Sequence, residues 1–61
     1  MTHSELKRQL KAIGCYVIRE GKNHELWFSP ITNKQFPVGR HDKQEVAVGT
    51  LKSIKRDSGL K

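Results

Sequence analysis

The tripeptide Gly21-Lys22-Asn23 lies between two runs of β-favouring residues, and this arrangement restricts the fold more than any other feature of the chain. Residues 15–20 contain Tyr, Val and Ile in succession, and residues 24–29 contain Leu, Trp and Phe. Glycine and asparagine both tolerate positive φ, so the tripeptide predicts a tight turn. We therefore expect two antiparallel strands joined as a hairpin.

Alternation along these strands predicts which side chains share a face. One face of the first strand carries Cys15, Val17 and Arg19, and one face of the second carries His24, Leu26 and Phe28. The adjacent Trp27 and Phe28 must therefore point to opposite sides, one into the core and one onto the outer face, where it could cover the sheet or stack with a partner. Cys15 is interpreted as a small core residue.

A third strand and an N-terminal helix complete the order of the first two thirds of the chain. Residues 30–34 form a loop, and Gln35 to Val38 resemble a strand in which Pro37 favours an edge position. At the N-terminus, Thr2 and Glu5 have the spacing of a capping box. The helix that follows has one apolar stripe and a glycine at its end, made by Leu6, Leu10, Ile13 and Gly14.

The C-terminal third predicts a polar connection and a second helix. Residues 40–43 are loop-like, and residues 46–48 could form a brief extended piece. A helix then starts at about Gly49 or Thr50 and turns Leu51 and Ile54 inward. Gly59 and Leu60 match the C′ and C″ positions of a Schellman-type end.

The resulting order, α-β-β-β-α, is that of double-stranded-RNA-binding domains. We expect a single small α+β domain over residues 1–61, with a three-stranded antiparallel sheet and both helices on one face. Element order alone is weak evidence for function. A chain of 61 residues also has only a thin core, so any chemistry must take place at the surface.

The charge balance favours a polyanionic partner. Twelve Lys and Arg residues against six Asp and Glu residues give a net charge of +6, and nucleic acid is the commonest partner for such a small basic domain. The alternative is that the charge serves solubility alone. One cysteine allows no internal disulfide, and no apolar run approaches the ~20 residues of a membrane span, so we expect a cytoplasmic protein without a membrane partner.

His24 is the candidate catalytic residue. The three histidines and Cys15 are scattered over different predicted elements, and the carboxylates are spread out, so we expect neither a metal site nor another cofactor. A histidine at a strand start can act as general base toward the ribose 2′-hydroxyl of RNA, since histidine exchanges protons near neutral pH. The alternative is that His24 merely begins a strand. We expect His3 at the surface, whereas His41 either contacts RNA or has no role.

Basic side chains could stabilise phosphate charge and hold the RNA strand. The candidates nearest the ends of the sheet are Lys22, Lys34 and Arg40, and those on one face of the second helix are Lys52, Lys55 and Arg56. The helical trio has an alternative interpretation as a solvated face that interacts favourably with the helix dipole.

Three ordered segments, Gly21–Trp27, Phe36–His41 and Gly49–Lys55, resemble HicA-type toxins of prokaryotic toxin–antitoxin systems. The likeness extends over nearly the whole chain. It implies a fold like that of double-stranded-RNA-binding domains, ribosome-independent cleavage of mRNA, and neutralisation by a HicB-type antitoxin that covers the active face. The catalytic histidine of the family corresponds to His24.

The sequence departs from the family pattern at two positions. Asn23 stands where serine is common, and Gly39 stands where proline usually precedes the Arg-His pair, which implies a looser loop around Arg40. The competing hypotheses are a non-catalytic RNA-binding module that uses the same basic face and a protein-interaction fragment. We expect a monomer, and the exposed edges of a small sheet leave dimerisation open.

Overall fold

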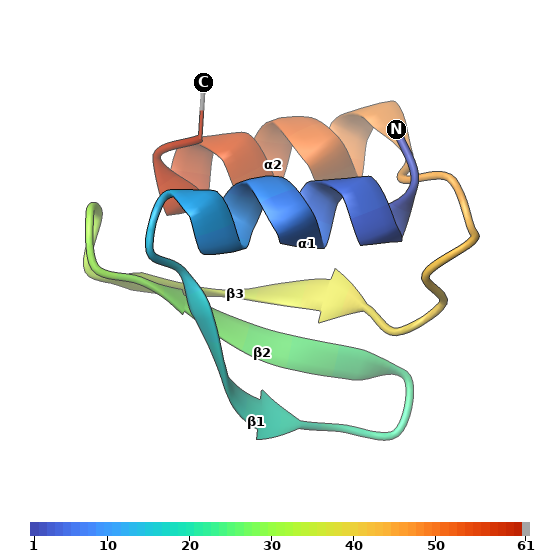
Figure 1. Ribbon diagram of the computed structural model, residues 1–61, viewed down its shortest axis with the longest axis horizontal. Coiled ribbons are helices and arrows are strands. Elements are labelled where there is room, and N and C mark those ends of the chain that lie inside the picture. The colour runs from blue at the N-terminus through green and yellow to red at the C-terminus, as the bar shows by residue number, and fades with distance from the viewer. Residues whose placement is uncertain (61) are drawn as a thin grey trace.

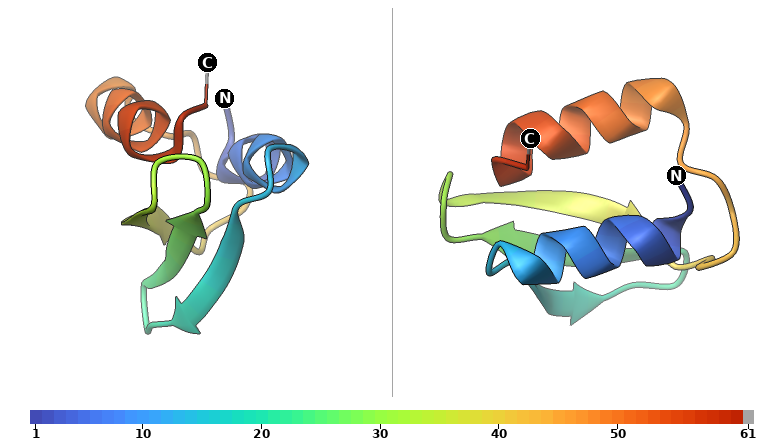
Figure 2. Two further views of the ribbon diagram at one scale, coloured as in Figure 1. Left: turned by 90° about the vertical axis from the view of Figure 1, so that its left-hand side faces the viewer. Right: turned by 45° about the horizontal axis from the view of Figure 1, so that its top comes forward.

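Both helices pack on one face of a three-stranded antiparallel sheet (Figures 1 and 2). This computed structural model describes residues 1–60. The elements in chain order are α1 (His3–Ala12), β1 (Tyr16–Glu20), β2 (His24–Ser29), β3 (Lys34–Gly39) and α2 (Val48–Ser58). The predicted α-β-β-β-α fold, like that of double-stranded-RNA-binding domains, is therefore confirmed. Neither helix within residues 1–60 is both long and apolar enough to cross a membrane.

Helix α1 begins with the predicted capping box. The Glu5 N–H donates to Thr2 Oγ1 at 3.3 Å, and the Thr2 N–H donates to Glu5 Oε1 at 3.4 Å. These bonds satisfy backbone donors that the first helical turn leaves unpaired. Gly14 follows the helix with φ of +95°, a conformation that suits glycine. The buried stripe of Leu6 and Leu10 then faces the sheet.

A β-bulge in β1 moves Arg19 to the face of the sheet away from the helices. Val17 lies opposite Trp27, and Arg19 lies opposite Leu26, so Ile18 is an extra residue on β1. An extra residue reverses the alternation beyond it. The prediction that Arg19 shares a face with Cys15 and Val17 was therefore wrong.

The predicted hairpin is present, but not for the predicted reason. Within residues 1–60, positive φ occurs at Gly14, Asn33 and Gly59, not in the Gly21–Asn23 turn. The Gly21 N–H donates to the His24 carbonyl at 2.7 Å, and a Cβ on Gly21 would lie 2.8 Å from that same oxygen. Glycine is required here because the two backbone segments approach so closely.

The core lies between the sheet and the helices. Its buried residues come from both helices, from the inner face of the sheet and from the connections that precede β1 and α2: Leu6, Leu10, Cys15, Trp27, Phe36, Val38, Val46 and Ile54. Of the adjacent pair Trp27 and Phe28, Trp27 is the one that lies in the core, and Cys15 is the predicted small core residue. Pro37 lies on β3, which is an edge strand as predicted.

The connection from β3 to α2 and the end of α2 correct two predictions. Val46 is buried in the core and its N–H donates to the Met1 carbonyl at 2.9 Å, but Val48 already belongs to α2 rather than to an extended piece. At the other end, the Gly59 N–H donates to the Lys55 carbonyl, and the Leu60 N–H donates to Ser58 Oγ. The helix thus ends in the simpler αL motif instead of the Schellman pair of bonds, because a serine hydroxyl accepts from Leu60.

Candidate functional site

His24 opens β2 on the face of the sheet away from the helices. Its neighbours Trp27 and Ser29 are buried under the helices, so by alternation His24 points to the opposite side, where its side chain is exposed. A shallow hollow surrounds it, lined by Arg19, Gly21, His24, Glu25, Leu26 and Pro37. The imidazole is therefore accessible to a molecule that approaches this face.

Arg40 holds the turn that precedes His24. Its Nη1 donates to the Gly21 carbonyl at 2.7 Å, and its backbone N–H donates to the Asn23 carbonyl at 3.3 Å. These two bonds anchor Arg40, although Gly39, in place of the proline usual in the family, had predicted a looser loop there. The structure thus brings Arg40, the exposed Lys22 and His24 together around one turn.

Lys7 supports this region from the helix side. Its Nζ lies 3.1 Å from Glu25 Oε1 and 2.7 Å from Asp42 Oδ1, and Glu25 Oε1 also accepts from Trp27 Nε1 at 3.2 Å. The lysine therefore links the residue after His24 to the loop that follows Arg40. Burial lowers the pKa of Lys7, but the hydrogen bonds with Asp42 and Glu25 outweigh it and leave that pKa raised. The same hydrogen bond lowers the pKa of Asp42.

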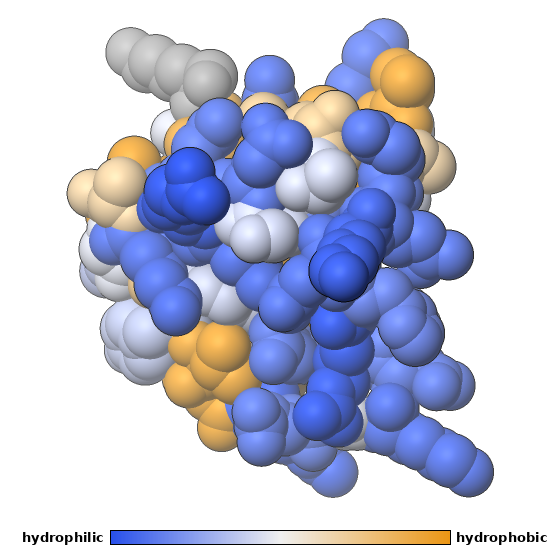
Figure 3. Space-filling model, turned by 45° about the vertical axis from the view of Figure 1, so that its right-hand side comes forward, coloured by the Kyte–Doolittle hydropathy of each residue, from blue (hydrophilic) through white to orange (hydrophobic). Residues whose placement is uncertain are grey.

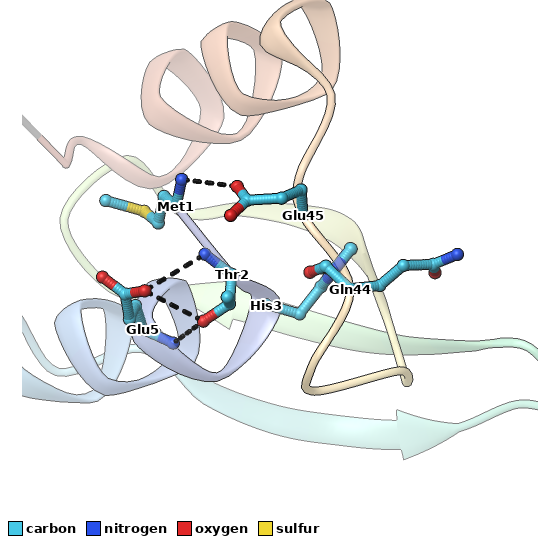
Figure 4. Close-up of polar contacts among 6 residues, drawn as sticks. All are labelled: Met1, Thr2, His3, Glu5, Gln44 and Glu45. Carbon is cyan, nitrogen blue, oxygen red and sulfur yellow. Dashed lines mark hydrogen bonds and ion pairs between the residues drawn. The ribbon is translucent and has the colours of Figure 1, made fainter.

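His3 is buried, so the prediction that it lies at the surface was wrong. Its Nδ1 donates to the Gln44 carbonyl at 2.7 Å, which requires that Nδ1 carry the proton because a carbonyl only accepts (Figure 4). A Cβ on Gly39 would lie 2.8 Å from His3 Nε2, so the imidazole occupies the space that a larger residue would need. Nearby, the Met1 ammonium pairs with Glu45 at 2.7 Å. The N-terminus thereby fastens the connection between β3 and α2.

The remaining predicted RNA-contact residues lie away from His24. Lys34 pairs with Ser29 at the opposite end of the sheet, five residues along β2 from His24, or about 17 Å. The end of α2 is fastened to that same region, since Ser29 Oγ donates to the Ser58 carbonyl at 2.6 Å and Thr32 Oγ1 donates to the Asp57 carbonyl. Lys55 and Arg56 in the last turn of α2 therefore lie near Lys34.

The predicted basic residues thus form two groups. The histidine end carries Lys22 and Arg40, and the opposite end carries Lys34, Lys55 and Arg56. Lys52, one turn earlier in α2, is exposed, whereas Lys55 is half-buried. Seen from the side of the hairpin turn and the 40–47 connection, the surface is mostly hydrophilic, with an apolar patch at the level of the strands (Figure 3).

His41 lies in the loop next to Arg40. It is exposed and lines a second shallow hollow together with Arg40, Asp42, Lys43 and Gln44. Its carbonyl accepts from the Gln44 N–H at 3.0 Å, which closes a turn in the loop. No group of three or more potential metal ligands gathers within residues 1–60.

Arg19 is the site residue that sequence reasoning missed. Strict alternation assigns it to the inner face, and only the bulge at Ile18 turns it toward the hollow of His24. A bulge without glycine has no distinct sequence signal, because any residue can occupy it. The charge of Arg19 was visible in the sequence, but its position was not.

The chain also matches a known protein family over nearly its whole length. The family model described as the HicA toxin of bacterial toxin–antitoxin systems matches residues 4–60. No curated protein and no solved structure matches the chain significantly. The match covers almost the entire chain and defines the class of protein as the toxin component of a toxin–antitoxin system. The chain belongs to the HicA toxin family, which implies an antitoxin as its partner.

Proposed function

We propose that this toxin is an endoribonuclease that cleaves mRNA independently of the ribosome and of metal ions, with His24 as general base. The observation that carries the proposal is the exposed His24 at a turn clamped by Arg40 and surrounded by basic side chains. Cleavage of mRNA would inhibit translation and growth. A HicB-type antitoxin that covers the face of the sheet with His24 would neutralise the toxin.

The chemistry requires little from the protein because RNA carries its own nucleophile. A neutral imidazole of His24 removes the proton of the 2′-hydroxyl, and the 2′-oxygen attacks the adjacent phosphorus. The new bond closes a 2′,3′-cyclic phosphate, the bond to the 5′-oxygen breaks, and that oxygen takes a proton from water. Positive side chains stabilise the charge that develops on the phosphate.

The division of the basic residues suggests two roles for them. Lys22 and the remaining N–H groups of Arg40 lie at the histidine end and are assigned to the reacting phosphate. The second group, Lys34, Lys55 and Arg56, is assigned to phosphates further along the RNA strand together with Lys52, one turn earlier in α2. Charge neutralisation there contributes affinity without sequence information.

The second candidate is a non-catalytic RNA-binding module. It is favoured by the basic group at the far end of the sheet, which can bind a phosphate backbone without any contribution from His24. The two candidates differ in one outcome, because only the nuclease loses its activity when the imidazole is removed.

The test is incubation of the purified protein with a defined mRNA in EDTA, comparing wild type with His24→Ala and His24→Gln. Glutamine keeps the polarity of the position but cannot act as a general base at neutral pH. We expect both variants to remain folded by circular dichroism and to cleave about 10²- to 10⁴-fold more slowly. Unchanged cleavage by the variants would refute the role of His24, and no cleavage by the wild type would favour the binding module.

A further inference from the structure

The face of the sheet away from the helices carries side chains that the proposed cleavage step leaves without a role. Register places Tyr16 opposite Phe28 and Arg19 opposite Leu26, and residues directly opposite in an antiparallel sheet share a face. We call this surface the open face; its side chains are Tyr16, Arg19, His24, Leu26, Phe28, Gln35 and Pro37. The two helices pack on the other side (Figure 2).

An aromatic pair stands at one end of the open face. The ring centroids of Tyr16 and Phe28 are 5.6 Å apart with an interplanar angle of 50°, and Tyr16 is 51% exposed. The other large aromatic residues of the sheet, Trp27 and Phe36, are almost fully buried beneath the helices. The ring of Tyr16 therefore presents a surface on which a flat group can stack.

The open face is also electropositive beside His24. Within residues 1–60, Arg19 forms no ion pair, although it is exposed and lines the hollow of His24. The carboxylate of Glu25, which could have neutralised it, is instead engaged with Lys7 and the Trp27 indole on the helix side. Across the strands from Arg19, the open face is apolar, because Leu26 is the strand partner of Arg19 and Pro37 is the strand partner of Leu26.

We propose that the open face binds unpaired nucleotides of the RNA strand, with a base stacked on the Tyr16–Phe28 pair and a phosphate held by Arg19. Sites for single-stranded nucleic acid combine aromatic stacking surfaces with a basic track in this way. Bases within a duplex stack on one another and have no free face, so the aromatic pair selects splayed single strands. The inference rests on the proposed function for the identity of the ligand.

The spacing along β2 places this subsite beside the reacting nucleotide. His24 and Phe28 are four residues apart on one face of the strand, a separation of about 13 Å. Arg19 lies between them because its strand partner is Leu26. The base on the aromatic pair therefore belongs to a nucleotide that flanks the cleavage point, and Arg19 holds the backbone between the two.

The test measures binding without cleavage, in a His24→Ala background, by fluorescence anisotropy with a labelled single-stranded RNA and with the same strand in a duplex. We expect Tyr16→Ser to weaken single-strand binding about tenfold, whereas Tyr16→Phe retains it, because one stacked base contributes a fold-change of this order. Arg19→Gln should also weaken binding and reduce the salt dependence by about one phosphate contact. The matched controls are Ile31→Ser and Arg8→Gln, which alter an equally exposed apolar residue and an exposed arginine outside the open face.

Two results would overturn the proposal. In the first, the Tyr16→Ser and Arg19→Gln variants bind the single strand as tightly as their control variants do. The open face would then be left as a surface for a protein partner. The other is tighter binding of the duplex than of the single strand. If single-strand affinity depends on Tyr16 but the wild type cleaves no RNA, the subsite is supported and the proposed nuclease fails.

Discussion

Gly39→Ala tests how the N-terminus is joined to the site. A Cβ at this position would lie 2.8 Å from Nε2 and 3.1 Å from Cδ2 of His3, closer than such atoms normally approach. The ring cannot easily move away, because it is buried and its Nδ1 donates to the Gln44 carbonyl. Gly39 is also the strand partner of His24, so a displacement here would reach the site.

The expected size of the effect follows from two opposing contributions. Overpacking of this kind costs about 1–3 kcal/mol. The backbone of Gly39 does not have positive φ, so alanine also reduces the entropy of the unfolded chain and returns about 0.4–1 kcal/mol. The free energy of unfolding should therefore fall by about 1–2 kcal/mol, and the melting temperature by about 5–15 °C for so small a domain.

A double-mutant cycle isolates the contact. Urea unfolding can be followed by the fluorescence of the buried Trp27 in the wild type, Gly39→Ala, His3→Ala and the double variant. Once the imidazole is absent, Gly39→Ala should become neutral or slightly stabilising, with a coupling energy of about 1–3 kcal/mol. If the cost of Gly39→Ala is the same with and without His3, the packing argument is wrong.

The remaining predictions concern Arg40 and the ion pair between Lys7 and Asp42. Arg40→Ala should reduce the single-turnover cleavage rate by tenfold or more, because the turn loses its clamp and His24 is then poorly aligned. RNA affinity should fall only a few-fold. A loss of affinity without a loss of cleavage rate would contradict this prediction. The folded pKa of Asp42 is lowered, so its contribution to stability is present above the unfolded pKa of about 3.9 and is lost as pH falls through the folded value. The wild type should accordingly melt at a higher temperature than Asp42→Asn at pH 7, and this difference should vanish in strong acid. A difference that does not depend on pH would count against the ion pair. The raised pKa of Lys7 predicts that its contribution persists at neutral pH and is lost only as alkaline pH passes through the folded value.

The element order was predictable because it depends on local signals. The capping box of Thr2 and Glu5, the stripe of Leu6 and Leu10, and the turn before His24 each act over a few residues. Such signals specify helices, strands and their ends without knowledge of what packs on them. The sequence by itself thus determined the α-β-β-β-α order, the opposite facing of Trp27 and Phe28, and the net charge of +6.

Only the tertiary structure decided which side chains meet. The bulge at Ile18 turns Arg19 toward His24, and no local pattern marks it because the extra residue is defined by pairing with β2. His3 is buried because the connection after β3 folds back over it, a contact between residues 41 positions apart. The basic residues divide into two groups because antiparallel pairing sends Lys34 to the far end of the sheet from His24. Long-range pairing brings distant segments together, and a site made from several segments can be located only once that pairing is known.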